Sequence, residues 1–566
     1  MSAFVYPFDG DMILKKKRSI KKQLLCQKGL LEVRIAILSG STIGDIQDIL
    51  ELFLLDFGIK PLFYCGQYNR FYEDVLFENK ELSDFRPDII YIHTSAYNLS
   101  DDDLLNKLKS MWERIKADFG CTIIQNNFEL PSYRFLDNCG KINELNLEIS
   151  RYAEKNNSFY INDIQYLSAF YGLEKWIDEQ SYYLYKYAFN IRAIPLVCHN
   201  IAKIIKSIYG KNRKCLVLDL DNTLWGGVVG DVGALGIELG AESALGEAYV
   251  SFQRYVKKLH DIGIILAVCS KNDEQIAKEA FKNPNMILQL EDIAVFCANW
   301  NSKAENILAI ANQLNILPES LVFIDDSPFE RELVKRALPE VAVLEVDSVV
   351  DFVRYIDWSG CFDTTHISSD DIKRNEYYNA DSQRNETKAS FENYGDYLES
   401  LQMSSKISPF CAEHLDRITQ LINKTNQFNL TTKRYTFNEI EKIAADERYI
   451  TLYATLDDKF GNNGIVSALI GEIVESELHI RLWVMSCRVF RRDLELAIFD
   501  RLIEICQKKK MTKLVGYYFK TEKNAFVSRL LETLAFHKVT NEVWEFYISD
   551  KPVCNNHYIK IVGRDD

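Results

Sequence analysis

The chain has 566 residues, of which 47% are hydrophobic and 26% charged, and its formal net charge is -14. This length and composition predict three or four globular domains and exclude a largely disordered chain. The acidic balance argues against nucleic acid or an anionic membrane as the main partner, so we expect neither.

The basic run KKKRSIKK at 15–22 is interpreted as the solvated face of an N-terminal helix. The 13 cysteines are scattered without metal-ligand spacing, which predicts neither a disulfide framework nor a zinc site and favours a reducing compartment. No apolar run reaches the roughly 18 residues that a membrane span needs. We therefore expect a soluble, cytoplasmic protein.

The predicted elements begin with a helical extension over 1–30. Residues 31–208 contain apolar runs that end in polar residues, such as VRIAILSGST and DIIYIHTSAYNLS, with helical patterns between them. Alternating elements of this kind predict a doubly wound α/β domain, whose ligands bind at the carboxyl ends of the strands.

The same pattern returns over 209–360, with the runs KCLVLDLDNT, GIILAVCSKND, IAVFCANW and SLVFIDDSP. It predicts a second, Rossmann-like domain with a parallel sheet. Residues 361–403 are polar and helical and are interpreted as a bridging segment. Residues 404–566 combine successive strand patterns with one long helix, which predicts an α+β domain. The fold class is therefore a multidomain α/β protein.

Acidic residues follow two strands of the second domain. Asp219 and Asp221 come at the end of one strand, and Asp325 and Asp326 at the end of another. Carboxylates from neighbouring strand ends can converge on a hard divalent cation, and Mg²⁺ prefers such sparse oxygen ligation. One carboxylate could then attack phosphorus while a second moves a proton, so the pattern favours a metal-assisted phosphoryl reaction.

Further polar residues complete this predicted site. Ser270 can donate a hydrogen bond to a phosphate oxygen, Lys303 can place a charge beside it, and Thr223 can orient the phosphate from its loop. Asn222, Asn272 and Arg488 are predicted to bind substrate.

These motifs, in this order, resemble the haloacid dehalogenase-like (HAD) hydrolase superfamily, in the form of its subfamily IIIC. The resemblance implies that Asp219 is the nucleophile, Asp221 the general acid/base, and Ser270 and Lys303 the phosphate holders. It also implies Mg²⁺ bound by Asp219, the main-chain carbonyl of Asp221 and Asp325, with Asp326 in support. The motifs stand too close together for a large cap domain, which favours a macromolecular or tethered substrate.

The segments KCLVLDLDNTLWGGVVGDVG, IDDSPFERELVKRALPEV, LINKTNQFNLTTKRYT, FGNNGIVSALIG and SCRVFRRDLE together resemble the FkbH-like family. This resemblance implies transfer of a glyceryl unit from 1,3-bisphosphoglycerate to the phosphopantetheine thiol of an acyl carrier protein, with loss of phosphate. The alternative is a plain phosphatase that acts on a small phosphometabolite or a phosphoprotein. A non-enzymatic assembly protein is a third possibility, and it would have no need of paired carboxylates.

Glyceryl transfer through the enzyme would require a thiol, and two cysteines are candidates. Cys487 is followed by Arg488, Arg491 and Arg492, a positive setting that lowers a thiol pKa. Cys215 has the same strand parity as Asp219, although about 13 Å of strand separate the two. For both, the alternative is a small buried apolar residue.

The flanking domains resemble two other families. The C-terminal domain is similar to GNAT-type acyltransferases, but RVFRRD lacks the glycines that bind the CoA pyrophosphate, so we expect a groove for a carrier-protein arm instead. The N-terminal domain resembles SGNH-type hydrolases, with Ser41 at the nucleophile position and Asn98 in the later polar block. Because Asp178 is followed by Ser181 where a histidine is expected, we predict a non-hydrolytic role. His93 is the nearest replacement base.

Overall fold

The computed structural model describes residues 4–99, 103–131, 138–364, 369–388, 390–549 and 554–563. The chain divides into two compact units, one formed by Met1–Lys211 with Arg434–Ala445 and the other by Asn212–Lys433 with Asp446–Asp566. The segment Arg434–Ala445 lies within the predicted C-terminal domain but belongs to the first unit. Residues 365–368 and 389 of the predicted bridging segment lie outside the described residues.

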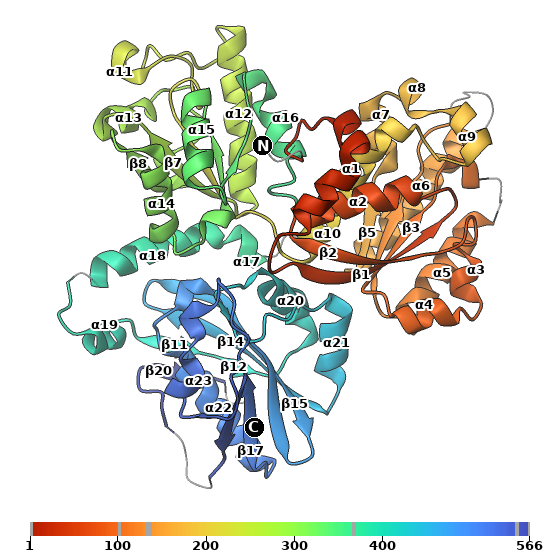
Figure 1. The fold of residues 1–566 in the computed structure, drawn as a ribbon. Helices are drawn as coiled ribbons and strands as arrows, with labels where there is room; N and C mark the ends of the chain where they lie inside the picture. The colour runs from red at the N-terminus through yellow and green to blue at the C-terminus, as the bar shows by residue number, and fades with distance from the viewer. Residues whose placement is uncertain are drawn as a thin grey trace. The chain divides into compact units, whose positions relative to one another are not determined.

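The first unit is built on a five-stranded parallel sheet with the order β2-β1-β3-β4-β5 (Figure 1). Its strands are β1 (Leu31–Ser39), β2 (Ile59–Cys65), β3 (Ile89–His93), β4 (Thr122–Asn126) and β5 (Phe159–Asn162). Three strands are buried along most of their length, as the apolar runs predict. The strand order reverses between β1 and β3, so their carboxyl ends diverge there and leave room for side chains.

Helices cover this sheet, and their bounds are α1 (Gly10–Leu24), α2 (Gly44–Asp56), α3 (Glu73–Leu76), α4 (Lys80–Phe85), α5 (Leu104–Asp118), α6 (Asn138–Lys155), α7 (Ile164–Tyr171), α8 (Leu173–Trp176), α9 (Glu179–Tyr185), α10 (Ile194–Ile208) and α21 (Phe437–Ala445). Helix α5 packs Leu108 and Trp112 against the sheet, whereas α2 and α10 pack against each other.

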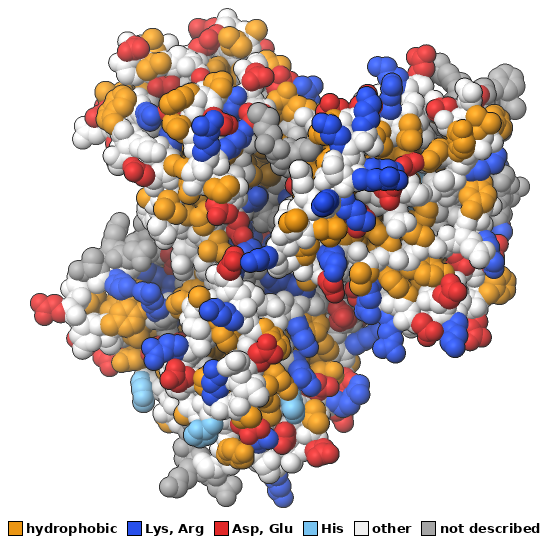
Figure 2. All heavy atoms as spheres, in the orientation of Figure 1, with side chains coloured by type: hydrophobic (Ala, Val, Ile, Leu, Met, Phe, Trp, Pro, Cys, Tyr) orange, Lys and Arg blue, Asp and Glu red, His pale blue; other side chains and the backbone are white. Residues whose placement is uncertain are grey.

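The basic run of the sequence lies on α1, over which Figure 2 shows blue side chains. Lys17 pairs with Asp45 and Asp48 at 2.8 and 2.7 Å, and Lys21 pairs with Glu51 at 2.6 Å. These acidic residues lie on α2, so the two lysines balance the negative charges of that neighbouring helix. Among the described helices, none is long and apolar enough to cross a membrane.

The second unit begins with a central domain, residues 212–364, that holds another five-stranded parallel sheet, of order β10-β9-β6-β7-β8. The strands are β6 (Cys215–Leu218), β7 (Ile265–Ser270), β8 (Ile293–Ala298), β9 (Leu321–Ile324) and β10 (Ala342–Val343). The helices are α11 (Val229–Val232), α12 (Ala244–Asp261), α13 (Glu274–Ala280), α14 (Lys303–Gln313), α15 (Pro328–Ala337) and α16 (Val349–Trp358). All residues of this domain are described, and none of them forms a large cap.

Helices α17 (Ser369–Ile372), α18 (Arg374–Lys388) and α19 (Tyr394–Ser400) lead to the C-terminal domain. Its mixed sheet has the order β18-β19-β17-β16-β15-β14-β11-β20, with β12 against β14 and β13 against β16. The strands are β11 (Met403–Ser405), β12 (Ile407–Ser408), β13 (Phe428–Asn429), β14 (Tyr449–Asp458), β15 (Gly461–Val474), β16 (Glu477–Met485), β17 (Lys513–Tyr517), β18 (His537–Lys538), β19 (Val543–Tyr547) and β20 (Ile559–Ile561). The helices are α20 (Leu415–Lys424), α22 (Leu494–Lys508) and α23 (Leu530–Thr533).

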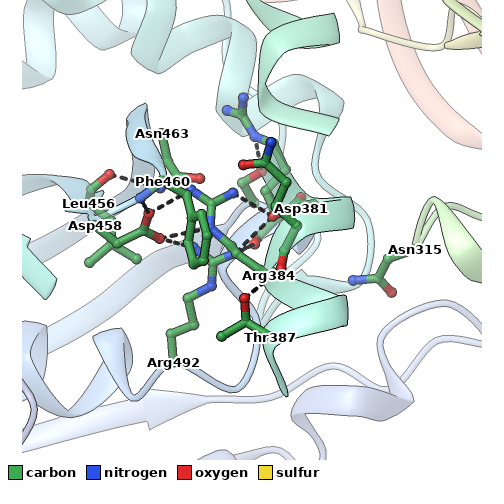
Figure 3. Close-up of polar contacts among 12 residues, drawn as sticks. Asn315, Asp381, Arg384, Thr387, Leu456, Asp458, Phe460, Asn463 and Arg492 are labelled. Carbon is green, nitrogen blue, oxygen red and sulfur yellow. Dashed lines mark hydrogen bonds and ion pairs between the residues drawn. The ribbon is translucent and has the colours of Figure 1, made fainter. Parts of the chain in front are cut away.

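An arginine–aspartate cluster ties α18 to this sheet, formed by Asp381, Arg384, Asp458 and Arg492 (Figure 3). Arg384 donates two hydrogen bonds of 2.8 Å to the carboxylate of Asp458 at the end of β14. Arg492 contacts the same carboxylate at 3.1 Å and Asp381 at 2.9 Å. Because the side chain of Asp458 is fully buried, its negative charge requires both guanidinium groups as partners.

We expect Arg384→Met to lower the free energy of unfolding of the second unit by about 3 kcal/mol, because a buried carboxylate then loses its bidentate partner. Scanning calorimetry measures the effect. The matched control is Arg529→Met in the exposed Arg529–Glu532 pair, for which a change below about 1 kcal/mol is expected. Equal effects of the two substitutions would contradict a structural role for the cluster.

Candidate active site

Three carboxylates meet at the carboxyl end of the central sheet. Asp219 follows β6, and Asp325 and Asp326 follow β9, its direct neighbour in the sheet. One oxygen atom of each carboxylate lies within 4.8 Å of the others. The adjacency of β6 and β9 therefore brings together residues that stand more than a hundred positions apart in the chain.

Lys303 lies between two of these carboxylates. Its Nζ is 2.8 Å from Oδ1 of Asp219, and it also donates to Asp325. Burial alone would lower the pKa of Lys303, but the attraction of Asp219 and Asp325 outweighs it and raises the pKa above its usual range. The lysine is therefore a permanent cation at the first turn of α14.

One lysine does not neutralise three carboxylates. Burial, together with the charge of Asp325, raises the pKa of Asp219 to about 6, although Lys303 and a hydrogen bond from Ser270 act against this shift. Burial and Asp325 also raise the pKa of Asp326. A divalent cation would supply the missing positive charge, and the all-oxygen donor set fits Mg²⁺.

The carboxylate of Asp221 stands apart from this cluster. Its Oδ1 accepts hydrogen bonds from Nε1 of Trp225 at 2.9 Å and from the backbone N–H of Val229 at 3.1 Å. Its Oδ2 accepts from Nδ2 of Asn272 at 2.9 Å. The side chain therefore does not join the three clustered carboxylates, and its acid/base role stays a prediction.

Two predicted residues hold loops in place. Thr223 is fully buried, and its hydroxyl accepts a hydrogen bond from the backbone N–H of Asp326 at 3.1 Å, which joins the two acidic loops. Asn222 has a left-handed φ of 54°, and its side chain accepts from the N–H of Gly227 at 2.9 Å. Asn222 therefore has the contacts of a turn residue. Asn272 contacts Asp221 and Ser270.

Two residues that contact the site were not singled out from the sequence. Trp225 contacts Asp221, and the buried Arg331 donates to the backbone carbonyls of Asp325 and Asp326 at 2.8 Å each. Trp225 stands in the segment TLWGG and Arg331 in DDSPFER. A hydrogen bond from an indole or a guanidinium to a neighbouring loop produces no characteristic residue spacing, so the sequence did not indicate these contacts.

The structure corrects the prediction that Cys215 is a functional thiol. Cys215 is not exposed to solvent. It lies on β6, buried in the core, where it packs with Ile265 and Leu321. Burial raises the pKa of its thiol far above the usual range, so no thiolate forms. The residue is an apolar core side chain.

The predicted thiol Cys487 lies away from the three carboxylates. Its carbonyl accepts a hydrogen bond from Asn315 at 2.9 Å, and it shares a cavity with Lys214 and Ser320. Those two residues precede β6 and β9, whereas Asp219 and Asp325 follow the same strands. Cys487 therefore faces the amino ends of the sheet, and direct transfer of a group between it and Asp219 is excluded in this arrangement.

Two of the arginines predicted near Cys487 make contacts with other residues. Arg492 belongs to the arginine–aspartate cluster, and the guanidinium of Arg488 lies 4.2 Å from the ring centre of Tyr377, with Nε donating to Ser486. The carboxylates of the cluster balance the charge of Arg492, whereas the two contacts of Arg488 are to uncharged groups. Substrate binding by Arg488 stays a prediction.

The carrier-protein arm stays a prediction, and the pairing of β16 shows where the strands of the C-terminal sheet part. β16 pairs with β17 only as far as Ile480. Beyond that point, Val484 and Met485 pair with β13, while β15 takes the other edge of β16. The carbonyl of Leu430, just after β13, accepts from the N–H of Phe519 at 2.9 Å. The chain's own strand therefore occupies the space where β16 and β17 separate.

In the first unit, Ser41 is buried and its hydroxyl has no hydrogen-bond partner among the described residues. Asn98 donates to the carbonyl of the neighbouring Gly40 at 3.3 Å. Ser181 donates to Asp178 at 2.8 Å.

His93 is fully buried, which lowers its pKa to about 3, and Tyr91 and Asn126 contact its Nδ1. The contacts of His93 are those of a structural histidine, and the SGNH-like assignment stays a prediction.

The metal-ligand geometry, the buried lysine and the separate Asp221 define a phosphatase-type site, and one solved structure matches this conclusion. It is the N-terminal part of the protein BF1531 from Bacteroides fragilis, described as containing a phosphatase domain and complexed with Mg. It is 32% identical, with a TM-score of 0.58, and the match covers 62% of this chain and 99% of that one. The chain belongs to the same family as BF1531, which supports a phosphatase function.

Two acetyltransferases match a smaller part of the chain. The ribosomal-protein-S18-alanine N-acetyltransferase of Escherichia coli is 18% identical over 27% of this chain and 99% of its own, with a TM-score of 0.22. The PaiA N-acetyltransferase of Thermoplasma acidophilum, in complex with coenzyme A, is 12% identical over 25% and 99%, with a TM-score of 0.20. The GNAT-like assignment stays a prediction. No protein-family model and no curated protein matches the chain.

We expect Mg²⁺ to raise the midpoint of thermal unfolding, because it relieves the repulsion among the three carboxylates. At 100 times its dissociation constant it adds about 2.7 kcal/mol to the free energy of unfolding. Since the metal competes with a proton on Asp219, whose pKa is raised to about 6, the gain should shrink as the pH falls below that value. Asp325→Asn should abolish the gain and Glu279→Gln on α13 should keep it; an unchanged gain in Asp325→Asn would contradict this site.

We expect Cys215→Ala and Cys487→Ser to keep the wild-type rate of phosphate release from p-nitrophenyl phosphate, because neither thiol contacts the carboxylate site. Phosphate release is measured at saturating Mg²⁺. A loss of more than about tenfold in Cys487→Ser, with an unchanged melting temperature, would place that thiol in the phosphatase reaction after all.

Proposed function

We propose that the chain is a Mg²⁺-dependent HAD-type phosphatase that also loads a glyceryl unit from 1,3-bisphosphoglycerate onto an acyl carrier protein. The convergence of Asp219, Asp325 and Asp326 around Lys303 carries the phosphatase part. The FkbH-like resemblance of the motif segments supports the glyceryl part.

The phosphatase reaction uses the residues of the site in two steps. A carboxylate oxygen of Asp219 attacks phosphorus, and the bond from phosphorus to the leaving oxygen breaks while Asp221 donates a proton to that oxygen. Water then attacks the aspartyl phosphate, Asp221 takes the proton from water, and inorganic phosphate leaves with Asp219 restored. Bound Mg²⁺ would reduce the repulsion between the phosphate and the carboxylates.

Lys303 and Ser270 hold the phosphate during both steps. Lys303 contacts Asp219 directly, and Ser270 acts on the pKa of Asp219, which supports a place for both groups near the attacking oxygen. A phosphate that bonds to Asp219 therefore arrives next to a buried cation and a hydroxyl donor.

Glyceryl transfer adds one acyl exchange. The phosphopantetheine sulfur of the carrier attacks the acyl carbon of 1,3-bisphosphoglycerate, its thiol proton is released, and the C1 phosphate leaves. The product is a phosphoglyceryl thioester, whose remaining phosphate is the substrate of the Asp219 site. The absence of a large cap over residues 212–364 leaves that site open to a tethered substrate of this kind.

The test takes intact masses of a phosphopantetheinylated carrier protein after incubation with the chain, Mg²⁺ and 1,3-bisphosphoglycerate. We expect a glyceryl gain with wild type and a phosphoglyceryl gain with Asp219→Asn, because the variant lacks the nucleophile. Phosphate release should fall by about 10⁴-fold in that variant. An unmodified carrier with both proteins, while phosphate appears only with wild type, would replace this proposal by a plain phosphatase.

A further inference from the structure

The carboxylate of Asp221 is held from both sides by donors on two different loops. Trp225, from the loop after β6, and Val229, at the start of α11, donate to Oδ1, and Asn272, from the loop after β7, donates to Oδ2. Three donors at 2.9 to 3.1 Å leave this side chain one orientation. The restraint points to residues whose task is to position Asp221.

The indole of Trp225 is fully buried in the core of the central domain, with Phe281 edge-on at 5.9 Å. Indole Nε1–H can only donate, and most buried donors have an acceptor. In Trp225 that acceptor is Asp221, whereas the indole N–H of the equally buried Trp483 has no partner among the described residues. Packing alone therefore does not explain the orientation of Trp225.

The backbone fixes the indole close to Asp221. The N–H and carbonyl of Gly226 pair with Glu238 at 3.0 and 2.8 Å. A Cβ on Gly226 would lie 2.9 Å from Cβ of Glu238 and from the ring of Tyr249, so only glycine permits this approach. The two chain segments therefore hold the residue next to Trp225 in a single register.

Asn272 connects Asp221 with the nucleophile. Its Nδ2 donates to Asp221 and lies 3.3 Å from the hydroxyl oxygen of Ser270. Ser270 also acts to lower the pKa of Asp219. Asn272 therefore contacts both the acid/base and a residue that influences the nucleophile.

We infer that Trp225 and Asn272 are positioning residues that aim Asp221 at the leaving oxygen in the first step and at the attacking water in the second. The inference rests on the proposed phosphatase function, and it concerns Asp221 alone. The carboxylates that would hold Mg²⁺ are those of Asp219, Asp325 and Asp326, whereas Trp225 and Asn272 contact Asp221, so we expect metal binding to be independent of both residues.

The test uses two phosphate esters, because they need the acid to different degrees. p-Nitrophenolate leaves without a proton, whereas an alkoxide such as that of glycerol 3-phosphate requires one. Trp225→Phe keeps an aromatic ring and removes the N–H. Asn272→Ala removes the side-chain donor to Oδ2 and leaves the indole in place, so the inference stays testable if Trp225→Phe does not fold. Trp483→Phe is the matched control.

For both variants we expect turnover of glycerol 3-phosphate to fall by about 10²- to 10³-fold. Turnover of p-nitrophenyl phosphate should fall by about tenfold and begin with a burst of p-nitrophenolate, because the aspartyl phosphate still forms but is hydrolysed slowly. The Mg²⁺-dependent gain in melting temperature should stay at its wild-type value, and Trp483→Phe should show neither effect.

Equal losses on the two esters without a burst, or wild-type rates on both, would overturn the positioning role. Failure of the phosphatase function itself has a different signature: wild type and Asp219→Asn would then release phosphate from neither ester.

Discussion

The central domain depends on how it accommodates three carboxylates around one lysine at the end of two neighbouring strands. Asp219 and Asp325 are buried, and buried charges are unfavourable unless they are paired. Lys303 pairs with both but leaves the cluster with an excess of negative charge. A bound cation would therefore stabilise the domain, and contacts from Thr223 and Arg331 hold the two acidic loops in place.

Asp221 shows that residues two positions apart can have separate tasks. It follows the same strand as Asp219, yet its carboxylate is directed to Trp225 and Asn272 and not to the acidic cluster. A carboxylate that is kept apart from the metal ligands remains available for proton transfer. The two carboxylates separate at the turn after β6, where Asn222 has a left-handed conformation.

In the C-terminal domain, residues that look available for ligands serve the fold. Arg492 compensates the charge of the buried Asp458, and β13 covers the edge that β16 exposes where it parts from β17. An exposed strand edge or an unpaired buried charge would destabilise the domain, so the chain uses its own segments to satisfy both.

The sequence by itself determined the parallel sheets, through apolar runs of strand length, and the set of site residues at their carboxyl ends, because strand ends are where a sheet places its ligands. Only the tertiary structure decided which thiols are accessible, since Cys215 points into the core and Cys487 lies at the opposite end of the sheet. It also decided the roles of Trp225 and Arg331, because a hydrogen bond across two loops depends on how the chain returns in space and leaves no periodic pattern along it.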